Sequence, residues 1–155
     1  MTSVSDTAKR QTARALDEAA QKLDGFSPMR MGWIKSMRKA LGMSAPDLAS
    51  RIGVTKAAIY QAERKEREGG VTIRQMEKLA EGLGGRFVYA IVPEGRVDDV
   101  VRNQARTKAT AIIKRASAHM ALEAQSLSTQ QTERQIEELT HELMRERPAD
   151  FWQMP

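Results

Sequence analysis

Apolar side chains recur at every third or fourth position along most of the chain, a spacing that predicts amphipathic helices. The first helix is expected over residues 7–23. Four shorter helices follow, and three of them begin after a residue that can serve as an N-cap. These N-caps are Ser44, Thr55 and Thr72. The four helices are expected over residues 33–41, 45–52, 56–65 and 73–83.

The hydrophobic pattern changes after Gly85 to a short run rich in β-branched and aromatic residues, RFVYAIV, which is closed by Pro93. This run predicts a β-strand over residues 86–93. A lone strand leaves its edges unpaired, so it needs a partner strand. A second copy of the chain is the simplest source, and an extended segment of the same chain is the alternative.

The last third of the chain returns to the helical pattern. A long apolar stripe predicts a helix over residues 98–122, and Ser128 with Gln131 forms a capping box ahead of another helix. The chain then closes with Phe151 and Trp152. Exposed aromatic pairs are unfavourable, so we expect both side chains to pack on the body of the protein or on a partner.

Composition limits the chemistry that is available. The 155 residues include no cysteine and two histidines, which excludes disulfides and thiolate nucleophiles, and neither a metal site nor a cofactor is expected. No nucleophile–base pair or phosphate-binding loop stands out, so an enzyme is the least favoured class of protein. The sequence has neither a signal peptide nor an apolar window of about 20 residues, so we expect a cytoplasmic protein without a membrane partner.

The net charge of +5 is unevenly distributed. Residues 29–92 hold twelve basic and six acidic side chains, whereas residues 116–155 hold three basic and seven acidic ones. A basic centre followed by an acidic tail is typical of a protein that meets a polyanion with one part and another partner elsewhere. The alternative is that this charge is ordinary surface charge.

The two helices on either side of Gly53 have the features of a helix-turn-helix. Ala49 is small enough to let the helices cross closely, Gly53 permits a left-handed turn, and Val54 and Ile59 fix that turn to the core. The helix after the turn is then held outward. Its N-terminal end can therefore enter the major groove of DNA, where every base pair presents a distinct pattern of donors and acceptors.

Two further side chains are assigned to the interior. Glu63 lies late in the outward helix and is expected to pair with Arg38 or Arg51, because a carboxylate that faced DNA would be repelled by phosphate. Trp33 is expected to lie in the core rather than to bind a ligand.

The segment LGMSAPDLASRIGVTKAAIYQAE resembles the helix-turn-helix of phage-repressor-like (Cro/CI, xenobiotic-response-element) regulators, and the resemblance covers residues 31–84. Ala45 stands where that family often has a glutamine that binds phosphate and supports the reading helix, which is the helix after the turn. This support is missing here. The resemblance implies base contacts from Lys56, Ala57, Tyr60 and Gln61, and backbone contacts from Ser44 and Thr55. Three further contacts to the DNA backbone are expected from the positively charged side chains of Arg64, Lys65 and Arg67.

Further segments resemble the small family called mobile mystery protein A, and together with the N-terminal helix they cover nearly the whole chain. They are GWIKSMRKALGM, GGRFVYAIVP, VVRNQARTKA, HMALEAQ and DFWQ. Members of that family are typically encoded beside a partner with a Fic domain, the fold that transfers AMP or a related group onto proteins. The resemblance implies a cassette like a toxin–antitoxin pair, with this chain as its DNA-binding and restraining half. The expected strand also resembles the dimer-forming strand of other repressor-like antitoxins, which implies dimer contacts through Phe87, Val88, Tyr89 and Ile91.

A short motif in the last helix offers one route to inhibition of such a partner. Thr129 and Glu133 match the first half of the Ser/Thr-x-x-x-Glu pattern of Fic inhibitors, whereas Arg134 replaces the Gly or Asn that completes it. The alternative is that Glu133 is a solvated helix residue.

Taken together, the sequence predicts a mainly α protein: a repressor-like helix-turn-helix bundle with one dimer-pairing β-strand and a long C-terminal helical extension. The leading hypothesis is a homodimeric, sequence-specific repressor that binds an inverted repeat in double-stranded DNA and autoregulates an operon with a Fic-domain partner. The alternative is an inhibitor that binds this partner through its C-terminal helices, with DNA binding secondary. The expected parts are an N-terminal helix (1–28), the helix-turn-helix domain (29–85), the strand (86–93) and C-terminal helices for dimerisation or partner binding (94–155).

Overall fold

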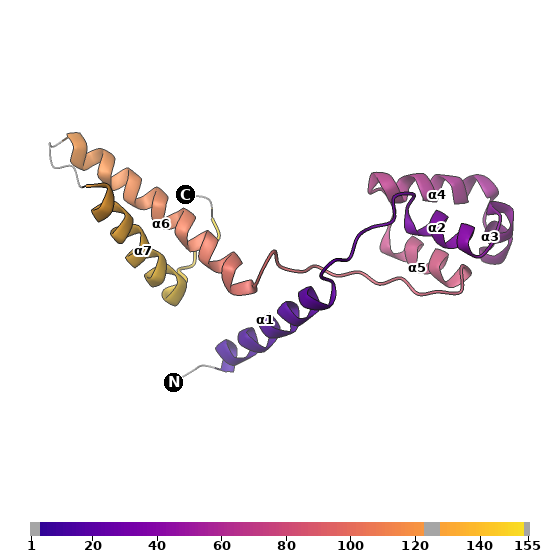
Figure 1. The fold of residues 1–155 in the computed structure, drawn as a ribbon, viewed down its shortest axis with the longest axis horizontal. Coiled ribbons are helices and arrows are strands. Elements are labelled where there is room, and N and C mark those ends of the chain that lie inside the picture. Colours follow the sequence, from indigo (N-terminus) through magenta and orange to yellow (C-terminus); the bar gives the residue numbers. More distant parts are fainter. Residues whose placement is uncertain (1–3, 123–127, 154–155) are drawn as a thin grey trace. The chain divides into compact units, whose positions relative to one another are not determined.

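The computed structural model describes residues 4–122 and 128–153, and this part of the chain contains seven helices (Figure 1). The helices belong to two compact units. The central unit is Gly25–Ile91, and the terminal unit combines the two ends of the chain, Met1–Asp24 and Val92–Pro155. Each unit has a hydrophobic core of its own.

Four short helices form the central unit, as the apolar spacing predicted. Their contacts bury an aliphatic core, and α3 packs against both α4 and α5. The helices are α2 (Trp33–Ala40), α3 (Ala45–Ile52), α4 (Lys56–Glu68) and α5 (Ile73–Gly82). The buried core residues are Ile34, Ala45, Leu48, Ala49, Ile59, Met76, Leu79 and Leu83.

The predicted N-caps explain where three of these helices begin. The side chains of Ser44, Thr55 and Thr72 each accept a hydrogen bond from a backbone N–H in the first turn of α3, α4 and α5, respectively. Helix α4 extends three residues beyond the predicted end, because the first residue with left-handed backbone is Gly69, with φ of 79°.

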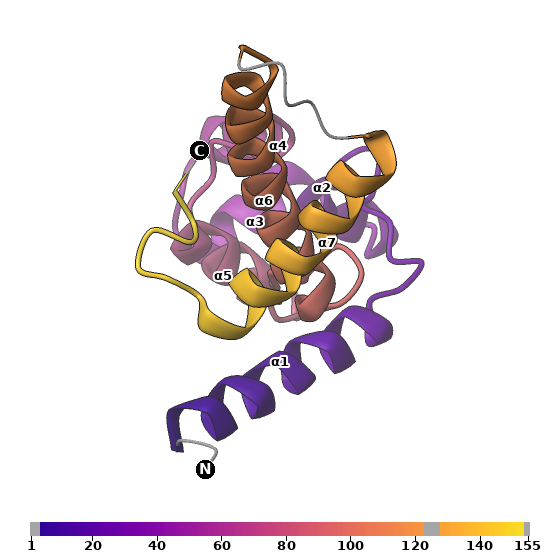
Figure 2. The ribbon, with the colours of Figure 1, turned by 90° about the vertical axis from the view of Figure 1, so that its left-hand side faces the viewer.

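In the terminal unit, two long helices pack side by side as an antiparallel pair, and Figures 1 and 2 both show this arrangement. They are α6 (Val97–Leu122) and α7 (Thr129–Glu146). Helix α1 (Val4–Lys22) has no buried residue and is joined to the start of α6 by a hydrogen bond of 2.9 Å from the Val97 N–H to Asp17 Oδ1. The core residues are Val101, Ala105, Ala109, Ile136, Leu143 and Phe151.

The segment after α7 folds back onto α6. The amide of Gln104 donates to the carbonyl of Phe151 at 2.7 Å, and the buried ammonium of Lys108 lies 2.7 Å from Asp150 Oδ2. This hydrogen bond from Lys108 lowers the pKa of Asp150. The Phe151 side chain is buried as expected, whereas Trp152 packs edge-on against it and stays 61% exposed.

The strand expected over residues 86–93 is not formed: the described residues contain helices and irregular segments but no β-strand. Phe87 packs partly on the central core, while Val88, Tyr89 and Ile91 lie exposed. The physical reason is that a strand needs backbone partners, and no backbone hydrogen bond joins residues 86–93 to another described segment. Pairing of this segment with a second copy stays a prediction.

Trp33 is also placed differently from the expectation. Its side chain is 40% exposed at the start of α2 and stacks on Phe26, with ring centroids 5.5 Å apart. The prediction of a core position was therefore wrong, because Ile34 occupies the inward position of this short helix. Among the described residues, no helix is both long and apolar enough to cross a membrane.

Candidate nucleic-acid interface

The position of α4 is fixed by its turn from α3. Gly53 has left-handed backbone with φ of 68°, and the Val54 N–H donates to the carbonyl of Ala49 at 3.0 Å. Ala49 itself is buried, so its small side chain permits the close crossing of the two helices. Thr55 then caps α4, which consequently begins directly after a short, hydrogen-bonded turn.

One face of α4 is open to solvent from its first turn onward. Ile59 and Glu63 lie on the opposite, buried face. The exposed side chains follow the spacing of one helix face, which is the shape required of a helix that enters the major groove. They are Lys56, Ala57, Tyr60, Gln61 and Arg64, with Glu68 one turn beyond Arg64.

Lys56 and Tyr60 contact each other across one helical turn. The ammonium of Lys56 lies 5.7 Å from the centroid of the Tyr60 ring, within the range of a cation–π interaction. Tyr60 remains 47% exposed. The contact holds the ammonium group close to the Tyr60 ring on the exposed face of α4.

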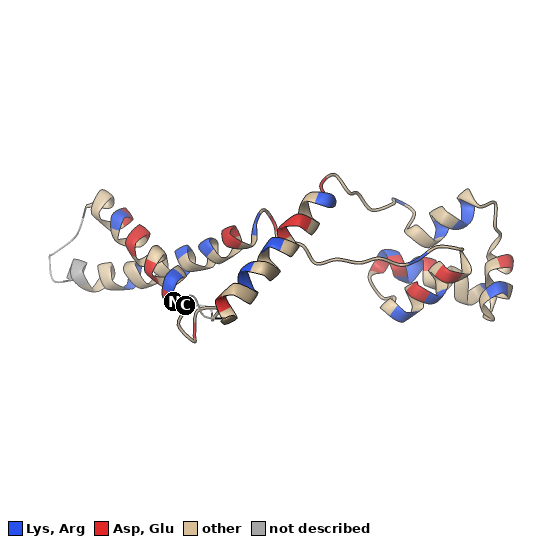
Figure 3. Cartoon of the chain, turned by 90° about the horizontal axis from the view of Figure 1, so that it is seen from below, with Lys and Arg blue, Asp and Glu red and all other residues tan. Residues whose placement is uncertain are grey.

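Two of the three acidic residues of α4 point toward other helices, and the third, Glu68, is exposed at the end of the helix. Lys, Arg, Asp and Glu are intermixed along the central unit (Figure 3), so the number of charges alone does not define a face. Glu63 is buried and binds Arg38 Nε at 2.8 Å, and Glu66 is half-buried against α2. The exposed N-terminal two-thirds of α4 therefore presents Lys56 and Arg64 without a carboxylate.

The pairing of Glu63 with Arg38 is one of the two partners that the sequence predicted. Arg38 also donates to the Met43 carbonyl at 3.1 Å, so the guanidinium is held on two sides. The other candidate, Arg51, donates instead to the Gly82 carbonyl at 2.8 Å. The Arg38–Glu63 pair joins α2 to α4 and thereby fixes the rotation of α4.

Glu66 has a structural role that the reasoning from the sequence missed. Its carboxylate accepts hydrogen bonds from the Trp33 N–H at 2.6 Å and the Ile34 N–H at 3.1 Å, and so caps α2 from a distant helix. Gly32 has no side chain with which to cap α2. The missing local cap is the one signal that could have pointed to a distant partner.

The five predicted contacts to the DNA backbone have different surroundings. Thr55 accepts from the Ala58 N–H, Arg64 is exposed, and Lys65 is half-buried. Arg67 donates to the Glu63 carbonyl at 3.2 Å.

Ser44 is engaged with an acidic side chain of its own helix. Its hydroxyl and its backbone N–H both donate to Asp47, the latter at 2.8 Å, and these hydrogen bonds lower the pKa of Asp47. Ala45, next in sequence, is buried and 2% exposed.

The two residues singled out for inhibition of a partner lie in the terminal unit. Thr129 is the first residue of α7, and Glu133 forms an ion pair with Arg106 of α6. Arg106 also lies 2.5 Å from Glu137. These two carboxylates, Glu133 foremost, raise the pKa of Arg106.

Comparison with known proteins identifies the class of the central unit. Residues 34–89 match a helix-turn-helix family model. No curated protein and no solved structure matches the chain significantly. The central unit is therefore a helix-turn-helix domain, and this match supports an XRE-like, DNA-binding transcriptional regulator. The resemblance to mobile mystery protein A, with its Fic-domain partner, stays a prediction.

Proposed function

We propose that the protein is a sequence-specific transcriptional repressor that reads DNA with the exposed face of α4. The observation that carries this proposal is the burial of Glu63, which leaves Lys56, Tyr60, Gln61 and Arg64 exposed along the first nine residues of α4 with no exposed carboxylate among them. A carboxylate on that face would oppose binding to phosphate, whereas amide and ammonium groups can bind base edges and backbone alike.

The side chains of this face differ in what they can recognise. Gln61 can bind adenine through two hydrogen bonds, and Lys56 can donate to the acceptors of guanine. Ala57 fits a thymine methyl group, and Tyr60 adds apolar surface next to it. Arg64 lies farther along α4, where a phosphate contact raises affinity without selecting sequence.

The repressor is proposed to act as a homodimer. Two helices related by a two-fold axis bind half-sites about 34 Å apart, one turn of DNA, so the operator is an inverted repeat. The operator is expected upstream of the protein's own coding sequence, because the proposed role is autoregulation of an operon.

Footprinting of that upstream DNA tests the proposal. The unmodified chain should protect one short inverted repeat, and the double variant Lys56→Ala plus Gln61→Ala should lose this protection. Lys78→Ala is the matched control, because it removes the same charge from α5, outside the α4 face. Diffuse protection, or equal loss in the control, would contradict sequence-specific reading by α4.

The salt dependence of binding distinguishes contacts to the DNA backbone from contacts to the bases. Arg64→Ala should weaken binding to operator and unrelated DNA alike, and should lower the slope of log K against log salt by about one. Lys56→Ala should instead reduce the difference in affinity between operator and unrelated DNA. Titrations at several salt concentrations measure both effects.

A second proposed role is binding of a Fic-domain protein through the terminal unit. The observation that favours it is the acidic exposed surface of α7, where no ion pair within the described residues engages Glu138 or Glu142. Co-purification with the product of the neighbouring gene tests it. Glu138→Lys plus Glu142→Lys should reduce recovery of that product, whereas Glu77→Lys plus Glu81→Lys on α5 should not. Equal recovery with both double variants would contradict this role.

A further inference from the structure

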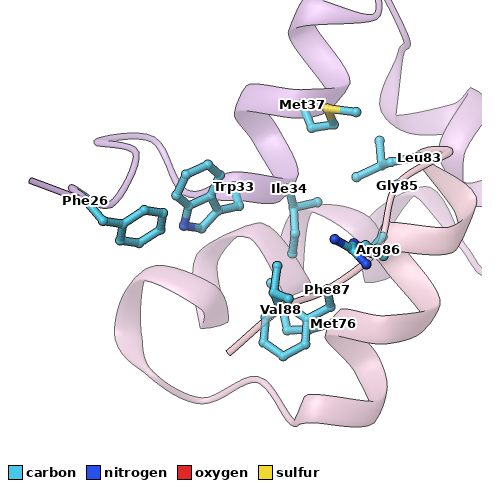
Figure 4. Close-up of a pocket in the computed structure, with 11 residues that line it drawn as sticks. Phe26, Trp33, Ile34, Met37, Met76, Leu83, Gly85, Arg86, Phe87 and Val88 are labelled. Carbon is cyan, nitrogen blue, oxygen red and sulfur yellow. The ribbon is translucent and has the colours of Figure 1, made fainter. Parts of the chain in front are cut away.

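An apolar groove of about 360 Å³ lies on the central unit (Figure 4). Helices α2 and α5 and the segments on either side of them line it, and all of the lining residues belong to the central unit. Two of its side chains, Trp33 and Met37, are each 40% exposed. Sites for small molecules typically have volumes of about 300–1,000 Å³ and mostly apolar walls, so the groove has the size and the lining of such a site.

Aromatic side chains stand at both ends of the groove. Phe26 stacks on Trp33 with ring centroids 5.5 Å apart and 12° between the ring planes. Figure 4 shows this pair at one end and Phe87 at the other. Met37 and Met76 also line the groove, and unbranched methionine side chains adapt to the shape of what they contact. A flat aromatic body can therefore pack against rings and thioethers along the groove.

Among the described residues that line the groove, Arg86 is the one that carries a charge. Figure 4 shows its guanidinium among the apolar side chains. Arg86 is exposed, and no hydrogen bond or ion pair within the described part of the chain engages its side chain. In the same unit, Arg38 and Arg51 donate to acceptors of the protein. The five donors of Arg86 are thus available to an anionic group, and a guanidinium binds a carboxylate through two parallel hydrogen bonds.

We propose that the groove is a binding site for a small aromatic carboxylate. The rings of this ligand pack against the apolar walls, and its carboxylate pairs with Arg86. Charge complementarity selects this class of ligand, because a neutral aromatic molecule leaves Arg86 unengaged and a cation is repelled by it. The lining residues include none of the exposed residues of α4, so the site is separate from the proposed DNA contacts and goes beyond the proposed function.

The charge preference is tested with two probes of similar shape, 2-naphthoate and its neutral counterpart 2-naphthamide. Isothermal titration of the unmodified chain should give a Kd about tenfold lower for 2-naphthoate, as expected for one charge-assisted pair. Arg86→Gln should raise the Kd of 2-naphthoate about tenfold and leave that of 2-naphthamide unchanged. Arg74→Gln is the matched control, because Arg74 is exposed on α5 but does not line the groove, and it should change neither value.

The location of the probe has a separate readout in the two tryptophans. Trp33 lines the groove, whereas Trp152 lies in the terminal unit. In ¹H–¹⁵N spectra of the unmodified chain, 2-naphthoate should shift the indole N–H signal of Trp33 and leave that of Trp152 in place. This measurement does not depend on any variant.

Three results would overturn the inference: no saturable binding of 2-naphthoate, an equal effect of Arg86→Gln on both probes, or a shift at Trp152 without one at Trp33. Affinity for 2-naphthoate that falls as the protein concentration rises would show that a second copy of the chain covers the groove, and would overturn it too. Binding through Arg86 together with the Trp33 shift supports it, whether or not a specific operator is found. Conversely, a chain that protects an inverted repeat but does not bind 2-naphthoate retains the proposed function and loses this site.

Discussion

At the residue scale, two carboxylates of α4 are turned toward other helices and act in different ways. Glu63 neutralises the buried Arg38, with side-chain exposures of 5% and 10%. Glu66 accepts the first backbone N–H groups of α2. Both contacts join α4 to α2, so the reading helix is positioned by charged side chains as well as by the apolar core.

Removal of Glu63 should be strongly destabilising. Glu63→Ala leaves the Arg38 guanidinium buried without a counter-charge, and we expect the free energy of unfolding to fall by about 3–5 kcal/mol in urea denaturation. Glu68→Ala, an exposed position on the same helix, should change it by about 0.5 kcal/mol or less. Arg38→Met plus Glu63→Leu should recover most of the loss, because neither charge then remains buried. A double variant as unstable as Glu63→Ala would contradict this account.

A side chain at Gly32 should be costly for two reasons. The backbone there has φ of 81°, and an added Cβ would lie 2.7 Å from Glu66 Oε2. Gly32→Ala should therefore lower the free energy of unfolding by more than about 1–2 kcal/mol, the cost of left-handed backbone alone. Gly42→Ala measures that cost by itself, since its φ is 64° and nothing lies within 4 Å of the added Cβ. Equal losses in thermal or urea unfolding would contradict a contact with Glu66.

At the scale of the element, each helix of the central unit owes its start to one or two side chains. In α3, Ser44 and Asp47 cap each other, and Asp47 also lies at the positive end of the helix dipole. The capping residues were visible in the sequence because a cap acts over three residues. The cap of α2 was not, since Glu66 lies more than thirty residues from the backbone groups it binds.

The cap of α3 should make stability depend on pH in a defined direction. Hydrogen bonds from Ser44 lower the pKa of Asp47 in the folded state, so the stabilisation is fully present above the ordinary pKa of 3.8 and is lost as the pH falls through the folded value. Melting temperatures of the unmodified chain and Asp47→Asn should therefore differ most above about pH 4 and converge in more acidic solution. In a Ser44→Ala background the difference should shrink. A difference that grows on acidification would contradict the assignment.

The extended segment shows how an element depends on its surroundings. The composition of residues 86–93 predicts a strand, and the single chain leaves the segment irregular. Strand preference describes how side chains fit a sheet, but the sheet itself requires a second backbone. The sequence therefore predicts the capacity to pair, and a partner decides whether the strand forms.

At the scale of the whole molecule, the chain divides into two units with separate cores, and each contains one tryptophan. Trp33 belongs to the central unit and Trp152 to the terminal unit. The terminal unit brings the first and last parts of the sequence together through the hydrogen bond between Asp17 and Val97. Local sequence patterns do not predict this contact between distant segments.

The two tryptophans allow the units to be followed separately. In Trp152→Phe chains, the fluorescence of Trp33 follows the unfolding of the central unit. In these chains Leu79→Ala should lower the urea midpoint, and Leu143→Ala should leave it unchanged. In Trp33→Phe chains, the fluorescence of Trp152 follows the unfolding of the terminal unit, and the effects of the two substitutions should be reversed. Each leucine is buried in one core, and its truncation should cost about 2–5 kcal/mol. Equal shifts of both reporters would show that the units unfold as one.

The sequence by itself determined the helices, the local caps of α3, α4, α5 and α7, the turn at Gly53 and the exposed face of α4, because all of these depend on residues within a few positions of one another. It also narrowed the partner of Glu63 to Arg38 or Arg51. Only the tertiary structure chose Arg38, revealed the cap supplied by Glu66, and left Trp33 beside an open groove. These features depend on how separate helices pack, and a pattern along one helix does not specify which distant side chain it meets.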